Sequence, residues 1–284
     1  MSVSIVIPAF NEARSIPSVL EEIKRVLAEG NSQGEVIVVD DGSSDGTADV
    51  IERLGHRVIR HDGNRGYGAA IKTGISHASG EMILITDADG TYPMEAIPRL
   101  IEEMKDAEMV VGARVGRKAK IPMIRRLAKW ALTMLANYLA ETRIPDLNSG
   151  FRIFRKHIAE NYHNILPSGF SFTGTITLAM HIDGFRVKYL PIEYHGRLGS
   201  SKFRPLADTF NYLVLIVRTI TFFNPLRVFL PLGFLLFFLG IATGLYSLLA
   251  LGRLADVTTV VLLVSSVQIF LLGILADVSV RRNR

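Results

Sequence analysis

The sequence predicts an α/β domain with a mostly parallel sheet and helices on both faces, followed by a C-terminal hairpin of two membrane-spanning helices. In the first part of the chain, short β-branched runs alternate with helical stretches, which is typical of parallel βαβ units. Near the C-terminus, two long and almost uncharged runs follow each other closely. Hydrophobic residues make up 49% of the chain, and their excess lies after Asn224.

The expected elements of the α/β domain alternate from Val3 onward. The predicted strands are Val3–Ile7, Val36–Val39, Val58–Arg60, Met82–Thr86 and Met109–Val111. The predicted helices are Ile16–Glu29, Ser44–Leu54, Tyr67–Ala78 and Met94–Lys105. Because parallel sheets bind ligands beyond the carboxyl ends of their strands, a site is expected in the segments that follow these strands.

The C-terminal part reads as two membrane spans. Val228 to Leu251 is an uncharged run that would extend about 36 Å as a helix, more than the ~30 Å hydrocarbon core requires. Val257 to Ala276 follows, with Gln268 as its only strongly polar side chain. Buried core helices are the alternative, but such helices rarely stay apolar on all sides for so long.

The distribution of arginines predicts the orientation of these spans. Arg218 and Arg227 precede the first span, three arginines lie between 281 and 284, and only Arg253 lies in the turn. This bias places the α/β domain and the C-terminus in the cytoplasm, at the plasma membrane if the protein is prokaryotic. The front of the chain opens into a strand without a signal-peptide pattern. The expected parts are a catalytic domain at 1–205, a juxtamembrane amphipathic helix at 206–227, and the hairpin at 228–284, with helices at about 228–251 and 257–277.

Composition narrows the chemistry. The net charge of +5 suits an anionic membrane surface, nucleic acid or phosphorylated substrates. The absence of cysteine excludes disulfides, thiolate metal sites and cysteine nucleophiles.

Polar segments follow three of the predicted strands. They are Pro8-Ala9-Phe10-Asn11-Glu12, Asp40-Asp41-Gly42-Ser43 and Asp87-Ala88-Asp89. Three acidic strand ends that converge on one edge of a sheet are hard to explain as solvated surface. They predict a ligand site at that edge.

The Asp87-Ala88-Asp89-Gly90-Thr91 segment has an alternative interpretation. It also resembles the nucleophile motif of haloacid-dehalogenase-type phosphatases, in which Asp87 would be phosphorylated and Asp89 would be the acid/base. Such enzymes need a later acidic pair, whereas the downstream acids here are scattered. Their motif also normally opens the fold, and here two acidic strand ends precede it.

Several motifs in a fixed order resemble those of family-two inverting glycosyltransferases, which have a GT-A fold. They are IVIPAFNE, VVDDGSSDGT, NRGYGAAIKTG and DADGTYP. The later DLNSGFRIF and GRLGSSK segments and the membrane hairpin resemble the polyprenyl-phosphate branch, which includes dolichyl-phosphate mannose and glucose synthases. The resemblance covers essentially the whole chain. It implies transfer of a hexose from a nucleotide sugar of the GDP-mannose or UDP-glucose type to dolichyl or undecaprenyl phosphate, with inversion.

The resemblance also implies a donor and metal site. Mg²⁺ or Mn²⁺ would offset the charge of the leaving diphosphate, held by the carboxylates of Asp87 and Asp89. Thr91 would be a poorer third ligand, because related mannose synthases carry Gln there. The residues implied for the nucleotide sugar are Pro8, Phe10, Glu12, Val39, Asp41, Gly66, Asp87, Ala88, Asp89, Arg114, Arg197 and Lys202.

Asp89, Asp146, Arg197 and Lys202 form the expected catalytic set. Asp146 matches the position proposed as base or acceptor organiser in related enzymes. Because a phosphomonoester is already ionised at neutral pH, we favour a positioning role for Asp146 through Arg152 or Lys202. A base and a turn-capping carboxylate are the alternatives. Arg197 and Lys202 are expected to clamp the diphosphate or the acceptor phosphate from a loop.

A basic segment with interleaved apolar residues follows Arg114. Such a segment suits an anionic membrane surface, and its place beside membrane spans argues against nucleic acid. The residues expected to meet the acceptor phosphate or the membrane are Arg117, Lys118, Arg125, Arg126 and Arg152.

The sequence bears on two further classes of protein. A processive polysaccharide synthase should carry a Gln-x-x-Arg-Trp signature, and the only glutamines here are Gln33 and Gln268. A catalytically silent membrane scaffold stays open. Related hairpin-anchored enzymes suggest a homo-oligomer, namely a tetramer.

Overall fold

The structure is a computed structural model that describes residues 2–30, 34–114, 134, 137–138, 141–169, 171–195, 221, 224–252 and 256–282. The chain divides into two compact units, Met1–Tyr212 and Leu213–Arg284. Each unit is described by itself below. Most of the expected juxtamembrane segment, residues 206–220, lies outside the described residues.

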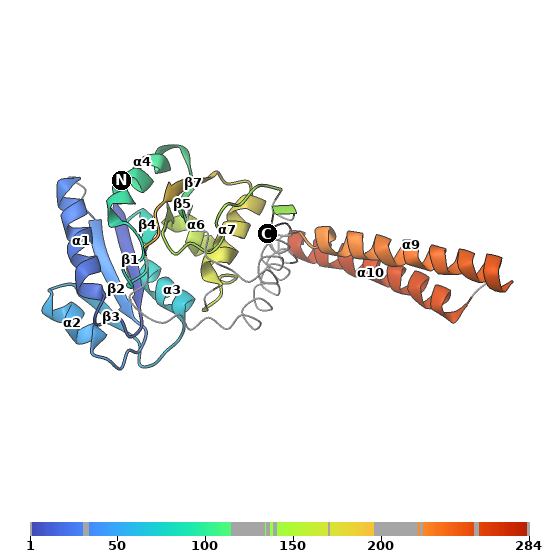
Figure 1. Cartoon of the computed structure of the whole chain (residues 1–284), viewed down its shortest axis with the longest axis horizontal. Coiled ribbons are helices and arrows are strands. Elements are labelled where there is room, and N and C mark those ends of the chain that lie inside the picture. Colours follow the sequence, from blue (N-terminus) through green and yellow to red (C-terminus); the bar gives the residue numbers. More distant parts are fainter. Residues whose placement is uncertain are drawn as a thin grey trace. The chain divides into compact units, whose positions relative to one another are not determined.

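A seven-stranded mixed sheet forms the centre of the first unit (Figure 1). The strand order is β3-β2-β1-β4-β6-β5-β7, and only β6 runs antiparallel to its neighbours. The strands are β1 Val3–Ala9, β2 Gly34–Asp40, β3 Arg57–Arg60, β4 Met82–Ile85, β5 Met109–Arg114, β6 Arg152–Arg155 and β7 Val187–Ile192. The mostly parallel sheet predicted from the sequence is confirmed.

Helices connect the strands. They are α1 Ile16–Glu29, α2 Thr47–Arg53, α3 Tyr67–His77, α4 Ile97–Glu103, α6 Lys156–Asn161 and α7 Phe172–Ile182. Short 3₁₀ turns, η1 Met94–Ala96 and η2 Met104–Asp106, flank α4. All predicted strands and helices up to β5 are present, with ends shifted by a few residues. The sequence did not indicate β6, α6, α7 or β7.

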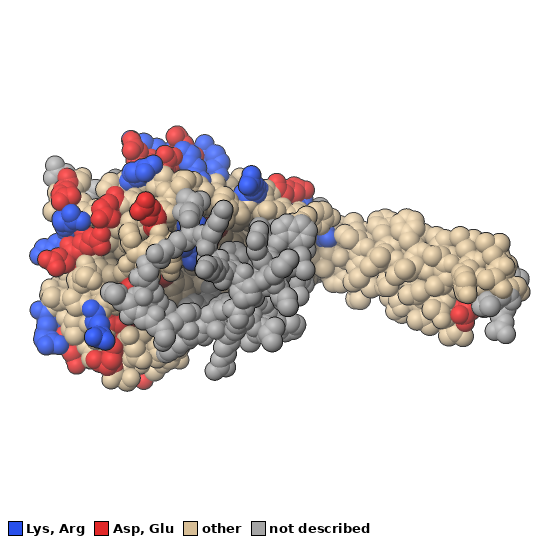
Figure 2. Space-filling model, viewed as in Figure 1, with Lys and Arg blue, Asp and Glu red and all other residues tan. Residues whose placement is uncertain are grey.

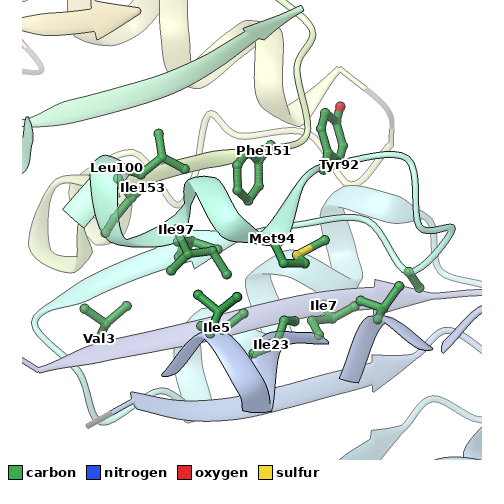
Figure 3. Packing of buried hydrophobic residues seen from close by; sticks show 14 of the residues in the cluster. Val3, Ile5, Ile7, Ile23, Tyr92, Met94, Ile97, Leu100, Phe151 and Ile153 are labelled. Atoms are coloured by element: carbon green, nitrogen blue, oxygen red, sulfur yellow. The ribbon is translucent and has the colours of Figure 1, made fainter. Parts of the chain in front are cut away.

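One face of the sheet carries the main hydrophobic core (Figure 3). Val3, Ile5 and Ile7 of β1 point to this face because side chains alternate along a strand. Ile23 of α1 and Ile97 of α4 pack against them. The core fixes the position of β1 and β4, and with it the loops at their carboxyl ends.

The opposite face of the sheet is covered by α3 and α7. Val6 of β1 points to this face and meets α3 at Gly74, where an added Cβ would lie 2.3 Å from Val6 Cγ1. Arg152, which alternates with the core residue Ile153 on β6, donates hydrogen bonds to α7 at Thr173 and Thr177. Helices therefore lie on both faces, as expected.

The second unit contains α9 Leu226–Leu251 and α10 Val257–Arg282. Both helices are long and apolar enough to cross a membrane. Only 11% and 17% of their apolar windows are buried, which argues against the buried core helices considered above. The visible surface of the hairpin is almost free of charged side chains (Figure 2).

Glycines bring the two helices of the hairpin close together. A Cβ at Gly233 would lie 2.5 Å from the Phe270 ring, and one at Gly240 would lie 2.8 Å from Leu263. Close packing at small residues is the usual way in which helices associate where lipid replaces water. The hairpin thus has the packing expected of paired membrane spans.

Replacing Gly74 by alanine tests the packing of α3 on β1. The new methyl group would overlap Val6, and such overpacking typically costs about 1–3 kcal/mol, partly offset by the higher helix propensity of alanine. We expect a lower thermal midpoint for Gly74→Ala. The double variant Gly74→Ala with Val6→Ala should lose less stability than the sum of the single variants. A midpoint at or above that of the wild type in Gly74→Ala would contradict this packing.

Candidate active site

The loops after β1 and β2 are joined by hydrogen bonds. Asn11 N donates to Ser43 Oγ at 2.8 Å, and Glu12 N donates to Thr47 Oγ1 at 2.9 Å. Phe10, in the same loop, is 37% exposed. The predicted contact residues Phe10 and Glu12 therefore lie together on a well-fixed loop at the carboxyl edge of the sheet.

Two other residues predicted for the nucleotide pocket lie within the strands themselves. Pro8 of β1 is paired in register with Val39 of β2, and both are buried. Val39 has no exposed surface at all. Contrary to the prediction, Val39 therefore offers no atoms to a nucleotide, because the sheet and its covering helices enclose it.

Asp41 is used by the protein's own loops. Its Oδ1 lies 2.7 Å from His61 Nδ1 and accepts from Arg65 N at 2.9 Å, and its Oδ2 accepts from Gly66 N at 2.8 Å. The residue is only 3% exposed. His61 in turn contacts Thr73 Oγ1 of α3 at 3.0 Å. Asp41 thus ties the end of β2 to β3 and to the start of α3, which differs from the direct donor contact expected of it.

Asp40 lies in one of the acidic segments predicted to border a ligand, although the residue predicted to contact the nucleotide was its neighbour Asp41. Asp40 Oδ1 accepts from the Ser43 backbone N at 3.3 Å and from the Ser43 hydroxyl. Among the described residues, no donor reaches its second carboxylate oxygen. The two adjacent aspartates therefore have different partners. Asp40 is the last residue of β2 and Asp41 follows it, so the side-chain alternation of a strand is the signal that could have separated them.

Gly66 and Gly68 allow a close approach between two parts of the chain. Gly66 has a φ of 101°, and an added Cβ would lie 2.6 Å from Ser168 O. A Cβ at Gly68 would lie 2.2 Å from Pro167 O. Ala69 N donates to the same Ser168 carbonyl at 2.9 Å. The 167–168 backbone therefore requires glycine at both positions, and the predicted contact of Gly66 with a donor stays a prediction.

The end of β4 carries Asp87, which a tyrosine orients. Tyr67 of α3 donates its hydroxyl to Asp87 Oδ1 at 2.9 Å. Burial, followed by the charge of Asp87, raises the pKa of the Tyr67 phenol well above its ordinary value, so this hydroxyl stays protonated. A Cβ on Gly150 would lie 2.7 Å from Asp87 Oδ1, so only a glycine fits beside this carboxylate.

Asp89 and Thr91 form a compact turn after Asp87. Thr91 donates to Asp89 Oδ1 through its hydroxyl at 2.6 Å and through its backbone N at 3.1 Å. Thr91 has no exposed surface, and Asp89 is 8% exposed. The structure therefore uses Thr91 to orient Asp89, which agrees with its being a poor third metal ligand; a role for Thr91 at a metal stays a prediction. Ala88, between the two aspartates, is 3% exposed and packs in the core.

The donor set fits a hard divalent cation that shares its ligands with a substrate. Among the described residues there is no group of three or more acidic or imidazole side chains. Asp87 and Asp89 alone would hold such a cation through one or two carboxylates, and a diphosphate and water would complete the shell, as Mg²⁺ commonly requires.

Asp146 is paired with Arg114, a partner that the sequence analysis did not foresee. Arg114 Nε donates to Asp146 Oδ2 at 2.7 Å, and the Arg114 backbone N donates to the same oxygen at 3.1 Å. Arg114 Nη2 donates to Asp146 Oδ1 at 2.8 Å. The Arg114 guanidinium also lies 5.4 Å from the ring centre of Tyr194. Burial alone would raise the pKa of Asp146, but the hydrogen bonds and charge of Arg114 outweigh it and lower that pKa. Asp146 is therefore ionised and already engaged.

Arg152 is fully buried, which corrects its predicted contact with the acceptor or the membrane. Its guanidinium donates to the carbonyls of Leu147, Ser149 and Thr173 and to Thr177 Oγ1. A side chain without exposed surface cannot reach a lipid phosphate. The predicted pairing of Asp146 through Arg152 is also replaced, since Arg114 takes that place.

The remaining predicted contacts lie in segments without described structure. They are Arg117, Lys118, Arg125, Arg126, Arg197 and Lys202. His195 is the last described residue before Arg197 and Lys202, and its backbone N donates to Thr91 O at 2.9 Å. The loop that carries Arg197 therefore starts directly beside the Asp87–Thr91 turn.

Two family models match parts of this chain. Residues 4–162 match the glycosyl transferase family 2 profile, and residues 224–278 match the GtrB C-terminal hairpin. A dolichyl-phosphate hexose transferase of Haloferax volcanii is 31% identical over 206 residues, which cover 72% of this chain and 87% of that protein. An undecaprenyl-phosphate 4-deoxy-4-formamido-L-arabinose transferase of Klebsiella pneumoniae is 32% identical over 262 residues, covering 89% and 77%.

Solved structures share the fold. Glucosyl-3-phosphoglycerate synthase from Mycobacterium tuberculosis, in complex with Mn²⁺, UDP-glucose and phosphoglyceric acid, superimposes with a TM-score of 0.61 at 20% identity. The match covers 77% of this chain and 79% of that one. The similarity shows the fold, which is the GT-A arrangement that the sequence motifs implied.

Replacing Asp41 by asparagine tests its role in joining β2, β3 and α3. One carboxylate oxygen would become an amide that faces backbone N–H donors, so at least one charge-assisted hydrogen bond would be lost, worth about 1.5–3 kcal/mol. We expect a lower thermal midpoint and faster proteolysis within residues 61–66. Asp62→Asn, which changes an exposed carboxylate in the same loop, should leave both measurements unchanged. Equal behaviour of the two variants would show that Asp41 does not hold this loop.

Proposed function

The chain belongs to glycosyl transferase family 2, and we propose that it transfers a hexose from a nucleotide sugar to a polyprenyl phosphate with inversion at the anomeric carbon. The observation that carries this proposal is the joint presence of the family-two domain, with Asp87 and Asp89 at the end of β4, and a matching GtrB hairpin in one chain. The relatives named above act on dolichyl and undecaprenyl phosphates, which supports the same class of acceptor here. Family membership replaces the phosphatase interpretation of Asp87 and Asp89.

The donor would bind across the carboxyl ends of β1, β2 and β4. Phe10 offers an exposed ring beside the joined loops, and one Asp40 oxygen has no described partner. A carboxylate oxygen can accept from a base N–H or a ribose hydroxyl. We therefore assign base and ribose recognition to Phe10, Glu12 and Asp40, while Asp41 holds their loops in place.

The diphosphate would lie beside Asp87 and Asp89. A bound divalent cation, Mg²⁺ or Mn²⁺, would supply charge compensation for the leaving diphosphate, and the Mn²⁺ in the related synthase supports this choice. Tyr67 holds Asp87 and Thr91 holds Asp89, so both carboxylates are oriented by protein hydrogen bonds. Arg197 and Lys202 would close over the same diphosphate from the loop that starts at His195.

The acceptor phosphate would approach from the side of Arg114. One of its oxygens attacks the anomeric carbon as the bond from that carbon to the diphosphate oxygen breaks, which inverts the centre. No proton has to be removed, because a phosphomonoester carries about −1.5 to −2 charges at pH 7. Asp146 therefore serves as a positioning residue that fixes the Arg114 guanidinium. The backbone N of Arg114 also donates to Asp146. The basic residues Arg117, Lys118, Arg125 and Arg126 would gather the lipid phosphate.

The arginine distribution supports a cytoplasmic α/β unit and C-terminus, with two spans formed by α9 and α10. Association of hairpins into a homo-oligomer belongs to the same proposal. A polyprenyl acceptor fits this arrangement, because its chain would stay in the bilayer while its phosphate reaches the enzyme.

The central experiment offers the purified full chain a panel of GDP- and UDP-sugars with polyprenyl phosphate and Mg²⁺ or Mn²⁺. We expect sugar transfer from at least one donor, and loss of transfer in Asp89→Ala by a factor of about 10³ or more, since a charge-stabilising group is removed. Asp62→Ala, which changes an exposed acid, should keep wild-type turnover. No transfer from any donor would favour the silent scaffold, and wild-type turnover in Asp89→Ala would refute the metal role.

The pairing of Asp146 with Arg114 predicts non-additive losses. Asp146→Asn and Arg114→Gln should each lower turnover about 10–100-fold, as expected for lost charge-assisted hydrogen bonds. The turnover of the double variant should be no lower than that of the single variant with the lower turnover. Multiplied losses would show that Asp146 acts independently, as a base would.

The lowered pKa of Asp146 also predicts a flat pH response from this pair. A carboxyl group with a lowered folded pKa contributes its stability above the unfolded value of about 3.9 and loses it as the pH falls through the folded value. Between pH 5 and 8, any fall of turnover at the acid end should therefore be the same in the wild type and in Asp146→Asn. A fall that is present in the wild type and absent in Asp146→Asn would assign proton transfer to Asp146.

A further inference from the structure

The turn from Asp146 to Phe151 lies between two parts of the candidate site. At its start, Asp146 accepts the hydrogen bonds of Arg114. Near its end, Gly150 lies against the Asp87 carboxylate and the Tyr67 hydroxyl, with an added Cβ 2.7 Å from Asp87 Oδ1 and 2.9 Å from Tyr67 Oη. Any change in the shape of this turn would therefore move the surroundings of both Asp87 and Arg114.

Besides the bonds of Arg114 and Arg152, the turn is held by bonds to Tyr92 and to β5 and by bonds within the turn itself. Gly150 N donates to Tyr92 Oη at 2.8 Å, and the Ser149 hydroxyl donates to Gly112 O at 2.6 Å. Arg152 Nε donates to Ser149 O at 2.9 Å, and a terminal nitrogen donates to Ser149 O and, at 3.3 Å, to Leu147 O. One guanidinium thus gathers two carbonyls of the same turn.

The other end of the Arg152 guanidinium is fixed by α7. Its second terminal nitrogen donates to Thr173 O at 2.8 Å and to Thr177 Oγ1 at 2.7 Å. The backbone of Arg152 is in register with Ile85 of β4 and Val111 of β5, the strands that lead to Asp87 and Arg114. Arg152 is therefore bound both to the framework and to the turn. Its acceptors in these bonds are neutral groups.

We propose that Arg152 is a positioning residue for both halves of the site. By holding the Leu147 and Ser149 carbonyls against α7, it sets the turn so that Gly150 lies against Asp87 while Asp146 meets Arg114. A buried arginine suits this task because its planar guanidinium donates in several fixed directions at once. The inference rests on the proposed function where it concerns transfer, whereas its structural part can be tested without any substrate.

The experiment changes a contact of Arg152 and leaves Arg152 in place, since removing a buried charged group can prevent folding. Thr177→Val deletes the hydroxyl that accepts from Arg152. Thr175→Val is the matched control: Thr175 is also buried in α7 and also donates to a carbonyl four residues earlier, Ser171 O. Thr177→Ser keeps the hydroxyl and should restore wild-type behaviour.

The first measurement is backbone hydrogen exchange of the full chain in detergent, without donor or acceptor. We expect exchange within residues 146–151 and at Arg114 to become about tenfold faster in Thr177→Val, since one bond to a charged donor is lost. Thr175→Val and Thr177→Ser should match the wild type in these segments. Equal exchange in Thr177→Val and Thr175→Val would overturn the proposal.

The second measurement is sugar transfer with the donor found in the panel. Thr177→Val should lower kcat several-fold compared with Thr175→Val, even where both variants lose the same amount of thermal stability. If both variants lose kcat in proportion to their loss of thermal stability, the role of Arg152 is purely structural and the proposal is overturned. If the wild type transfers no sugar, the proposed function fails, and hydrogen exchange alone decides the role of Arg152.

Discussion

The candidate site depends on hydrogen bonds that its carboxylates accept from the protein itself. A carboxylate taken out of water must find donors, and here each one finds them within the protein. Asp41 binds the start of α3, Asp87 binds Tyr67, Asp89 binds Thr91 and Asp146 binds Arg114. These bonds fix the loops at one edge of the sheet, so the site is organised before a substrate enters.

The sequence predicts which residues gather at this edge but not how they pair. Strand ends and motif order were sufficient to bring Glu12, Asp40–Asp41 and Asp87–Asp89 together. Partner choice depends on contacts between distant parts of the chain, such as Tyr67 with Asp87 or Arg114 with Asp146. Arg152 shows the limit most clearly: an arginine in a basic chain indicates an exposed anion contact, whereas this one is enclosed by β6 and α7.

The fold likewise has parts that local sequence signals predict and parts that depend on long-range contacts. The βαβ units up to β5 have local signals, because short β-branched runs alternate with helices. By contrast, β6 enters between β4 and β5 as an antiparallel strand, a position that only long-range pairing decides. Helix α7 is buried along almost its whole length from Phe172 to Met180, so it lacks the one-sided apolar pattern by which a helix is recognised.

The close contact of α3 with the 167–168 backbone has an electrostatic consequence. Many nucleotide-binding proteins hold phosphate at a helix start, where free amides and the helix dipole favour negative charge. In this chain the amides of Arg65, Gly66 and Ala69 already serve Asp41 and the Ser168 carbonyl, and a carboxylate stands where an anion would lie. Under the proposed function, an incoming pyrophosphate would therefore be neutralised by cations and basic side chains, and its retention would be sensitive to chelators and to ionic strength.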